Sequence, residues 1–420
     1  MFHPWGRAAL AAVVAAGLFS PASPARATNG YFAHGYGTPS KAMAGTGVTI
    51  GEGPLAAAQN PALGQQVGNV AGGCLTVFMP HRDVTFSDNG RMSALPPAKY
   101  DSQNEIFGIA CGGANFMVNE DTSVGALLFA NGGMNTKYDR ALFANFGAGT
   151  APTGVDMAQA FLALNLAHRV SETVTLGAAP VFAIQRFKAT GLEAFAGMSQ
   201  HPGDVTGNGY DYSYGGGLKV GAVWSATPWL TLGASYQSKM WMTPYDKYRG
   251  LFAEGGDFDI PAWASAGIAV EPVRGLTFLL EYQRIFYSDV ASIANGGAPP
   301  FGPLGSANGP GFGWKDMGVF KLGVQWQATS DLMLRAGYSH ATRFTDPNQV
   351  LFNVLAPATV RDHVSVGFGY SLSPAWRLSG SYTHAFSNTL TGSTPGLMMG
   401  QTATLRMDQD EATVSVSYRF

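Results

Sequence analysis

The last nine residues of the chain, Ala412-Thr-Val-Ser-Val-Ser-Tyr-Arg-Phe420, alternate strictly between apolar and polar side chains. Successive side chains of a β-strand point to opposite faces, so this period of two predicts a strand with one apolar and one polar face. The same alternation recurs upstream, in segments 276–283, 320–326, 332–339 and 364–370. The polar positions are rich in Gly, Ser and Gln, which suits a wet or ligand-lined interior better than the core of a sandwich.

The composition points away from an ordinary soluble domain. Only 12% of the 420 residues are charged, where about 25% is usual. Aromatic residues make up 12%, too many for a disordered chain. The formal net charge of −2 argues against a dedicated nucleic-acid binder, which would carry a basic excess. No Pro/Ser-rich linker divides the chain, so we expect one large all-β unit.

The first 27 residues have the features of a cleavable signal peptide. Arg7 supplies a positive charge, residues 8–19 form an apolar core, and Ala25-Arg26-Ala27 is a cleavage site. No later run of 18 or more uncharged apolar residues follows, which excludes a bundle of membrane-spanning helices. The exported protein is then either a secreted β protein or a transmembrane β-barrel.

The connections between the predicted strands alternate in length. Short turns are predicted at 119–122, 170–173, 225–229, 271–275, 328–331 and 373–375. Long Gly/Pro-rich loops are predicted at 83–104, 134–156, 189–209, 239–258, 288–313, 343–360 and 387–407. Six turns and seven loops give a 14-stranded antiparallel barrel over residues 69–420, with the asymmetry typical of bacterial outer-membrane barrels. Two points stay open, because residues 157–168 also read as an amphipathic helix and Pro180 interrupts the next strand.

Residues 28–68 do not alternate, and their small side chains suit a plug, or hatch, folded inside the barrel. Together with segments further along, they resemble the outer-membrane family of the long-chain fatty acid transporter FadL and the toluene transporter TodX. The resemblance is carried by Asn29-Gly30-Tyr31-Phe32, Ala42-Met43-Ala44-Gly45, Asn60-Pro61-Ala62, Phe258-Asp259-Ile260-Pro261-Ala262-Trp263, Phe352-Asn353-Val354-Leu355-Ala356-Pro357 and the terminal Phe420.

This resemblance implies a monomeric barrel in the outer membrane, plugged by its hatch. It implies that fatty acids or aromatic hydrocarbons cross by diffusion, without a cofactor, and leave through a sideways opening at a kinked strand. We expect the kink in the third strand, 123–133, at Gly125 or at Asn131-Gly132-Gly133. The implied partners are outer-membrane lipid, lipopolysaccharide and, through Phe420, the barrel assembly machinery.

Two predicted loops carry apolar side chains that are candidates for ligand contact. They are Leu192 and Phe195 in one loop, and Trp241, Met242 and Phe252 in the other. Exposed apolar patches commonly bind a partner. The alternative is that the loops pack on each other and close the mouth of the barrel, and both can hold.

Lys321 and Arg335 are candidate partners for a fatty-acid carboxylate, because they lie on adjacent predicted strands at mid-depth and face inward. A buried carboxylate needs cationic donors to offset its desolvation. The alternative is an internal ion pair with Glu281 or with a carboxylate of the hatch.

Cys74 and Cys111 lie on the first two predicted strands, nearly equidistant from the intervening loop. They form either a cross-strand disulfide, which an oxidising periplasm allows, or two buried thiols.

No catalytic or metal motif is present. G-x-S-x-G, G-x-x-x-x-G-K-[ST] and H-E-x-x-H are all missing, and the histidines are scattered. We therefore predict a passive importer of hydrophobic compounds that is not an enzyme. A general porin for polar solutes and an outer-membrane phospholipase are the alternatives, since a lipase's Ser and His need not be close in the chain.

Overall fold

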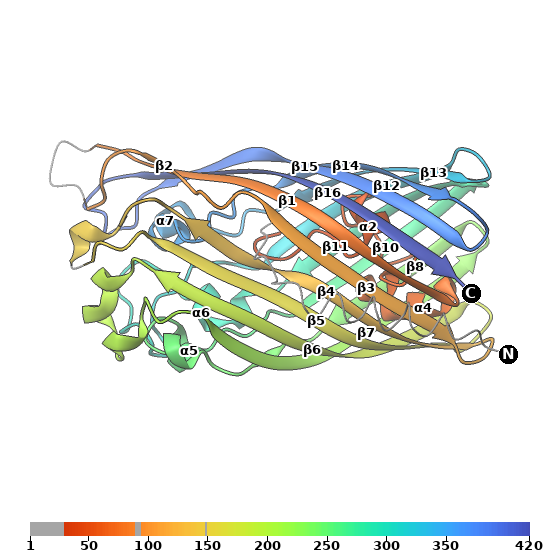
Figure 1. The fold of residues 1–420 in the computed structure, drawn as a ribbon, viewed down its shortest axis with the longest axis horizontal. Helices are drawn as coiled ribbons and strands as arrows, with labels where there is room; N and C mark the ends of the chain where they lie inside the picture. The colour runs from red at the N-terminus through yellow and green to blue at the C-terminus, as the bar shows by residue number, and fades with distance from the viewer. Residues whose placement is uncertain (1–28, 89–93, 148) are drawn as a thin grey trace.

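The computed structural model describes residues 29–88, 94–147 and 149–420, so the predicted signal peptide lies outside the described residues. In this part of the chain, fourteen antiparallel strands form a closed barrel (Figure 1). The barrel closes because β1 pairs with β16, from Val70↔Arg419 to Phe86↔Ala403. The wall strands are β1 (Val70–Phe86), β3 (Phe107–Met117), β4 (Thr122–Lys137), β5 (Gly154–Arg169), β6 (Val174–Thr190), β7 (Asp211–Thr227), β8 (Leu230–Gln237), β10 (Trp263–Val273), β11 (Leu276–Ile285), β12 (Met317–Gln327), β13 (Leu332–Ala341), β14 (Asp362–Ser371), β15 (Trp376–Gly392) and β16 (Ala403–Arg419).

Two further strands are short. β2 (Lys99–Asp101) pairs with the end of β1, and β9 (Trp241–Met242) pairs with β7. The short turns lie at the same end of the barrel as the C-terminus, and the long loops lie at the other end (Figure 1). The predicted fold class, strand number and alternation of connections are confirmed.

The strands differ from the prediction in extent. β1 and β15 run on into segments predicted as loops, and β16 begins earlier than predicted, because the β1–β16 and β15–β16 ladders continue at the loop end. Residues 157–168, which also read as a helix, lie in β5. Pro180 lies inside β6 at a position without a partner on β5, as expected for a residue without an amide hydrogen.

The outer surface of the wall is apolar. Alternate residues of single strands are exposed, such as Leu162, Leu164 and Leu166 on β5, and Phe278 and Leu280 on β11. A soluble protein rarely exposes so much apolar surface, whereas a barrel wall that faces lipid requires it.

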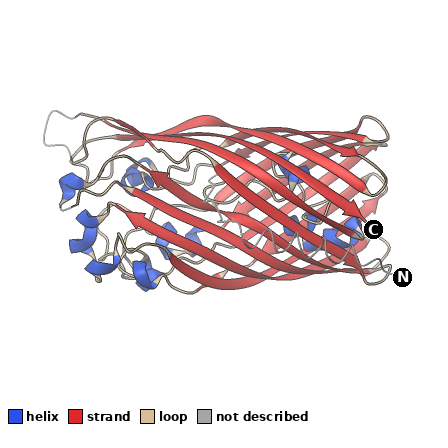
Figure 2. Ribbon diagram, viewed as in Figure 1, coloured by secondary structure: helices blue, strands red, loops and turns tan. Residues whose placement is uncertain are grey.

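The helices are all short (Figure 2). The hatch contains α2 (Thr38–Lys41), α3 (Ala56–Gln59), η1 (Pro61–Leu63) and α4 (Gly64–Val67), and the long loops contain η2 (Ala144–Phe146), η3 (Glu193–Met198), η4 (Pro202–Asp204), η5 (Asp246–Tyr248), α5 (Ala253–Gly256), η6 (Tyr287–Asp289), α6 (Ala291–Ala294), η7 (Pro347–Gln349) and α7 (Val350–Asn353). Among the described residues, no helix has the length and hydropathy needed to cross a membrane.

The hatch, residues 29–68, lies inside the barrel and contacts its inner wall (Figure 1). Glycines of the wall allow this close approach. A Cβ on Gly177, Gly221 or Gly337 would overlap with Ala62, Asn60 or Met43 of the hatch, respectively. The high glycine content therefore has a direct packing role at the contact between hatch and wall.

Candidate functional site

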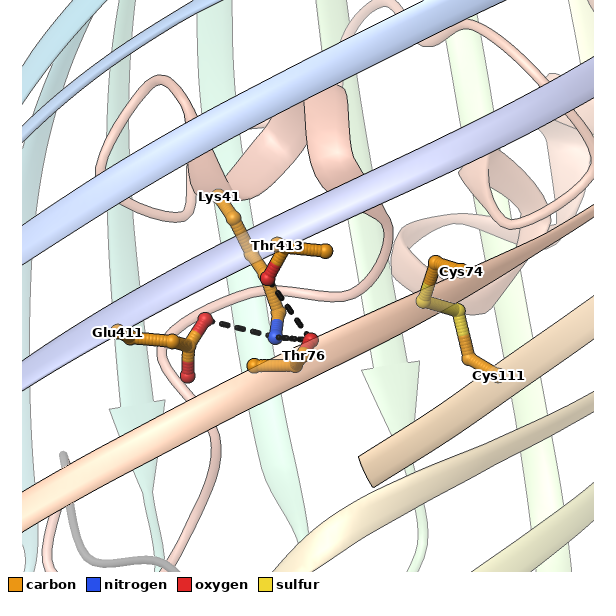
Figure 3. The surroundings of a disulfide bond; sticks show 6 residues. All are labelled: Lys41, Cys74, Thr76, Cys111, Glu411 and Thr413. Atoms are coloured by element: carbon orange, nitrogen blue, oxygen red, sulfur yellow. Dashed lines mark hydrogen bonds and ion pairs between the residues drawn. A yellow bond between two sulfur atoms is a disulfide. The ribbon is translucent and has the colours of Figure 1, made fainter. Parts of the chain in front are cut away.

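Three ion-pair groups, two of them buried and one half-buried, lie where the later part of the hatch meets the wall. Lys41 of α2 lies 2.7 Å from Glu411 of β16 (Figure 3). Lys321 of β12 lies 3.2 Å from Glu281 of β11, at hatch residues 45–48. Glu52 of the hatch completes the third group, described next.

Glu52 lies between two arginines of the wall. Its Oε2 lies 2.8 Å from Arg335 Nη2 and 3.2 Å from Arg377 Nε. The side chain of Arg335 is fully buried, and the single carboxylate of Glu52 faces two guanidinium groups of the wall. Such pairs are costly to break one partner at a time, because a buried charge is left unpaired.

Glu281 also fixes a turn of the hatch backbone. Its Oε2 accepts hydrogen bonds from the amides of Gly47 and Val48, at 2.9 and 3.0 Å. Lys321 Nζ donates to the carbonyl of Gly45 at 2.9 Å. Both charges of this pair are therefore satisfied by hatch backbone as well as by each other.

The Asn60-Pro61-Ala62 motif anchors the hatch to β5, β6 and β7. Asn60 Nδ2 donates to the carbonyls of Val48 and Ala222, at 2.6 and 3.1 Å, and Asn60 Oδ1 accepts from the amide of Ala62. Pro61 begins η1, and its carbonyl accepts from Asn165 Nδ2 at 3.0 Å. In this motif Asn60 forms the hydrogen bonds, Pro61 begins η1, and the small Ala62 lies close to Gly177 of the wall.

The barrel wall is incomplete between β3 and β4. The β3–β4 ladder runs from Met117↔Ser123 to Gly112↔Leu128 and ends there. Beyond it, among the described wall strands, residues 107–111 pair with β1 alone, and residues 129–137 of β4 pair with β5 alone. We call this separation the wall gap.

β4 contains a bulge at the wall gap. The β4–β5 register shifts between Ala130 and Gly132, which leaves Asn131 as the extra residue. Gly125 lies in regular register with both neighbouring strands, whose ladders are unbroken there. Of the two positions predicted for the kink, the bulge therefore lies at Asn131-Gly132-Gly133, and its role as an opening stays a prediction.

The start of the hatch occupies the free edge of β4. Phe32 forms an antiparallel bridge with Gly132. The amide of Gly133 donates to the carbonyl of Tyr31 at 3.0 Å, and the amide of Ala33 donates to the carbonyl of Asn131 at 2.7 Å. Residues 31–33 thus supply part of the backbone pairing that β3 does not.

Side chains extend this contact toward the loops. Tyr36 Oη donates to Asn131 Oδ1 at 2.7 Å, and Asn131 Nδ2 donates to Gln159 at 2.9 Å. Gln159 then donates to Gln185, which donates to the carbonyl of Phe258 in the β9–β10 loop. The bulge, the hatch and a long loop share one hydrogen-bond network.

The apolar loop residues pack together over the barrel mouth. Leu192, Phe195, Met242 and Phe252 are buried, whereas Trp241 is 61% exposed. The rings of Phe195 and Phe143 have centroids 5.0 Å apart, and those of Phe252 and Phe258 4.8 Å. This is the packing alternative of the sequence prediction, and a groove role for the four buried side chains would require the loops to part.

One loop carboxyl is sensitive to pH. Burial, with Asp259 and Glu254 nearby, raises the pKa of Asp257 to about 6. A raised carboxyl pKa means that this group's stabilising contribution is present below the ordinary pKa and is lost as the pH rises through about 6. The loop packing is therefore favoured by mild acid.

The cavities beside the hatch are small. One, lined by Tyr36, Met43, Ile50 and other hatch residues, has a volume of about 40 Å³. An engineered cavity that holds benzene measures roughly 150 Å³.

A family model described as "Outer membrane protein transport protein (OMPP1/FadL/TodX)" matches residues 20–420. The chain belongs to this family. This confirms the resemblance found in the sequence and identifies an outer-membrane transport protein. No curated protein sequence matches the chain.

Solved structures of similar fold cover nearly the whole chain. The toluene transporter TodX of Pseudomonas putida is 19% identical, covers 92% of this chain and 99% of its own, and has a TM-score of 0.69. A FadL homologue of Pseudomonas aeruginosa is 18% identical over 93% of this chain and 100% of its own, with a TM-score of 0.68. The toluene transporter TbuX of Ralstonia pickettii is 18% identical over 92% and 99%, with a TM-score of 0.64.

The assignment of Lys321 and Arg335 to a fatty-acid carboxylate stays a prediction. Each is already paired with a carboxylate of the protein, Glu281 or Glu52, as the alternative held. These carboxylates offset part of the desolvation of the two cations. Strand alternation revealed that both face inward but not what lies opposite them.

The structure places no group of three or more His, Cys, Asp or Glu side chains suited to a metal ion among the described residues. It joins Cys74 and Cys111 in a disulfide.

Removing the charge of Glu281 should loosen the hatch. In Glu281→Gln, Lys321 stays buried without its carboxylate, so we expect a loss of about 3 kcal/mol in the free energy of unfolding. Lys41 is the only Lys or Arg in residues 29–68, so cleavage of the native protein by trypsin after Lys41 measures hatch release. Thermal unfolding in detergent measures the stability.

Glu172→Gln, in an exposed turn, is the control and should behave as the wild type. The double variant Glu281→Leu/Lys321→Met should recover much of the loss, because no charge is left unpaired. Wild-type resistance to trypsin and heat in Glu281→Gln would contradict the assigned role.

A side chain at Gly132 should separate the hatch from β4. A Cβ there would overlap with the Tyr31 carbonyl, so Gly132→Ala should cost about 1–3 kcal/mol. Hydrogen exchange at the amides of Ala33 and Gly133 should accelerate. Gly108→Ala on β3, where a Cβ meets no atom within 4 Å, is the matched control, and equal exchange in both variants would refute the contact's importance.

Proposed function

We propose that the protein imports hydrophobic molecules, long-chain fatty acids or aromatic hydrocarbons, by passive diffusion, and releases them sideways through the wall gap. The observation that carries this proposal is the interrupted β3–β4 ladder, whose free β4 edge is paired with hatch residues 31–33. A removable segment at a break in the wall provides a route from lumen to lipid.

The surroundings of the wall gap suit an apolar solute. Phe78, Phe107, Ile109 and Ala130 form an apolar cluster there, and Phe129 of β4 packs at 5.7 Å against Phe161 of β5. Transfer of such a solute from water into an apolar site is favourable, by about 25 cal/mol per Å² of apolar surface. Movement can then proceed down a concentration gradient without ATP.

The bonds of the hatch indicate which part moves. Residues 31–36 are bound to the Asn131–Gly133 bulge by neutral hydrogen bonds of 2.7–3.0 Å. Residues 41–52 are held by the three ion-pair groups. Neutral hydrogen bonds contribute about 1 kcal/mol each, so the first part of the hatch can leave β4 while the later part stays.

The similar proteins support this substrate class. TodX and TbuX are described as toluene transporters, and CymD as a monoaromatic hydrocarbon channel. For this chain we extend the proposal to a monomer in the outer membrane that contacts lipid and lipopolysaccharide. Signal cleavage before Thr28 and recognition of the exposed Phe420 by the assembly machinery belong to the same proposal.

Uptake measurements test the function. In a deletion strain, the wild-type gene should raise uptake of labelled toluene, labelled oleate or both above the empty vector. Gly132→Ala should alter that rate, whereas Gly108→Ala should not. Liposomes containing the protein should not swell in sugars and should not release fatty acid from their lipid; swelling would favour a porin, and hydrolysis a phospholipase.

One buried cation differs from Lys321 and Arg335. Lys219 of β7 is 1% exposed, and it forms no ion pair with any residue that the structure describes. Its Nζ donates to the Ala58 carbonyl at 2.6 Å and lies 4.9–5.5 Å from the ring centroids of Tyr36, Phe129 and Trp263. We propose it as the group that receives a fatty-acid carboxylate when the hatch moves.

Lys219→Met should separate the two substrate classes. The variant keeps an apolar side chain of similar length among the rings but cannot bind a carboxylate. Oleate uptake should fall at least tenfold while toluene uptake stays within twofold of the wild type. Equal loss for both compounds, or no loss for oleate, would remove Lys219 from the proposal.

A further inference from the structure

The disulfide lies on the inner face of the wall. Cys74 of β1 and Cys111 of β3 are direct register partners, with Cα atoms 5.0 Å apart (Figure 3). The neighbouring Leu75 is 53% exposed on the outer face. The two cysteines line a cavity together with Gly37 and Leu55 of the hatch.

The bond sits where the wall divides. The β3–β4 ladder ends at Gly112, and Cys111 is the next residue. From Cys111 to Phe107, β3 has β1 as its one strand partner in the described part of the chain. The disulfide therefore joins this half-paired segment to β1 at the apex of the wall gap.

The strand to which β3 is tied is itself firmly held. β1 pairs with β16 along its whole length. Thr76, two residues from Cys74, is 2.8 Å from Thr413 of β16 and accepts from Lys41 Nζ at 3.1 Å (Figure 3). Lys41 is in turn paired with Glu411 at 2.7 Å. Covalent, ionic and ladder contacts thus converge on one side of the wall gap.

The other side has weaker bonds. β4 is bulged at Asn131, and its free edge is held by the neutral hydrogen bonds from residues 31–36 of the hatch and, nearer the loops, by Arg82 of β1, which donates to the Asn135 carbonyl. The two edges of the wall gap therefore differ in how firmly they are fixed.

We propose that the Cys74–Cys111 disulfide makes β3 the stationary edge of the side opening, so that the wall parts only between β3 and β4. This rests on the function proposed above. Residues 107–111 have backbone groups without a strand partner toward β4, and such groups are costly beside lipid. Without the covalent tie, this segment frays from β1 and swings toward β4, where pairing would satisfy those groups and close the opening.

The test compares wild type with Cys74→Ala/Cys111→Ala and with Cys74→Val/Cys111→Val. The valine variant refills the space of the cysteines without the bond, so a shared effect belongs to the covalent tie. We expect hydrogen exchange of residues 107–111 to rise at least tenfold in both variants, with β12 and β13 unchanged. Uptake of whichever hydrophobic compound the wild type carries should fall at least threefold. Wild-type protein treated with a phosphine reductant should show the same exchange, and reoxidation should reverse it.

Unchanged exchange at residues 107–111 would overturn the proposal. So would exchange that rises throughout the barrel, because the bond would then stabilise the fold in general, or local loosening with wild-type uptake. If the wild type carries no hydrophobic compound, the proposed function fails on that result alone. The exchange measurements then decide separately whether the bond fixes the edge.

Discussion

Inside a bilayer every backbone N–H and C=O group must find a partner within the protein, and the rest of this structure depends on that constraint. The fourteen wall strands meet it by closing the barrel through the β1–β16 ladder. The β3–β4 ladder, in contrast, ends part-way along the two strands, at Gly112↔Leu128. There the hatch supplies partners at Tyr31 and Ala33, so a segment outside the wall provides part of the pairing of the wall.

Because the hatch takes the place of β3 beside β4, the wall can meet two requirements that conflict in a simple barrel, sealing the membrane and allowing lateral exit. A complete ladder seals the membrane, but it also prevents lateral exit. A strand edge that is paired with a detachable segment can be sealed at rest, and it can open without breaking a backbone ladder between wall strands. The close approach depends on Gly132, because a Cβ there would overlap with Tyr31. The bulge at Asn131 turns both its backbone carbonyl and its side chain to the hatch.

Much of the fold could be predicted because lipid imposes a strict pattern on the wall. Apolar residues at alternate positions, as in 276–283, revealed the strands, and turn lengths revealed their number. The pattern weakens where lipid no longer contacts the strand, and there the prediction failed: β1 and β15 continue into segments that read as loops. Gly125 and Gly132 look alike in the sequence, and only the three-dimensional register separates the regular position from the one at the bulge.

The site was harder to predict for a related reason. The alternation of apolar and polar residues along a strand shows that a side chain faces the lumen, but it does not show which hatch residue that side chain contacts. The hatch does not alternate and comes from a distant part of the chain. Lys219, Lys321 and Arg335 all have inward phase, yet two are paired with carboxylates and one lies among aromatic rings. The same limit applied to Glu52, whose role depends on two arginines far along the chain.

The distribution of bond strength along the hatch suggests why one chain can be both plug and gate. Buried ion pairs resist partial opening, because separating either partner exposes a charge to a poorly solvating site. They occur at Lys41, Glu52 and Glu281, where the hatch meets β11 to β16. Between residues 31–36 of the hatch and the β4 bulge the contacts are neutral hydrogen bonds and ring packing, which a hydrophobic solute can replace with contacts of its own. The hatch is therefore fixed where a lasting seal is needed and exchangeable where an apolar molecule would compete for the same surface.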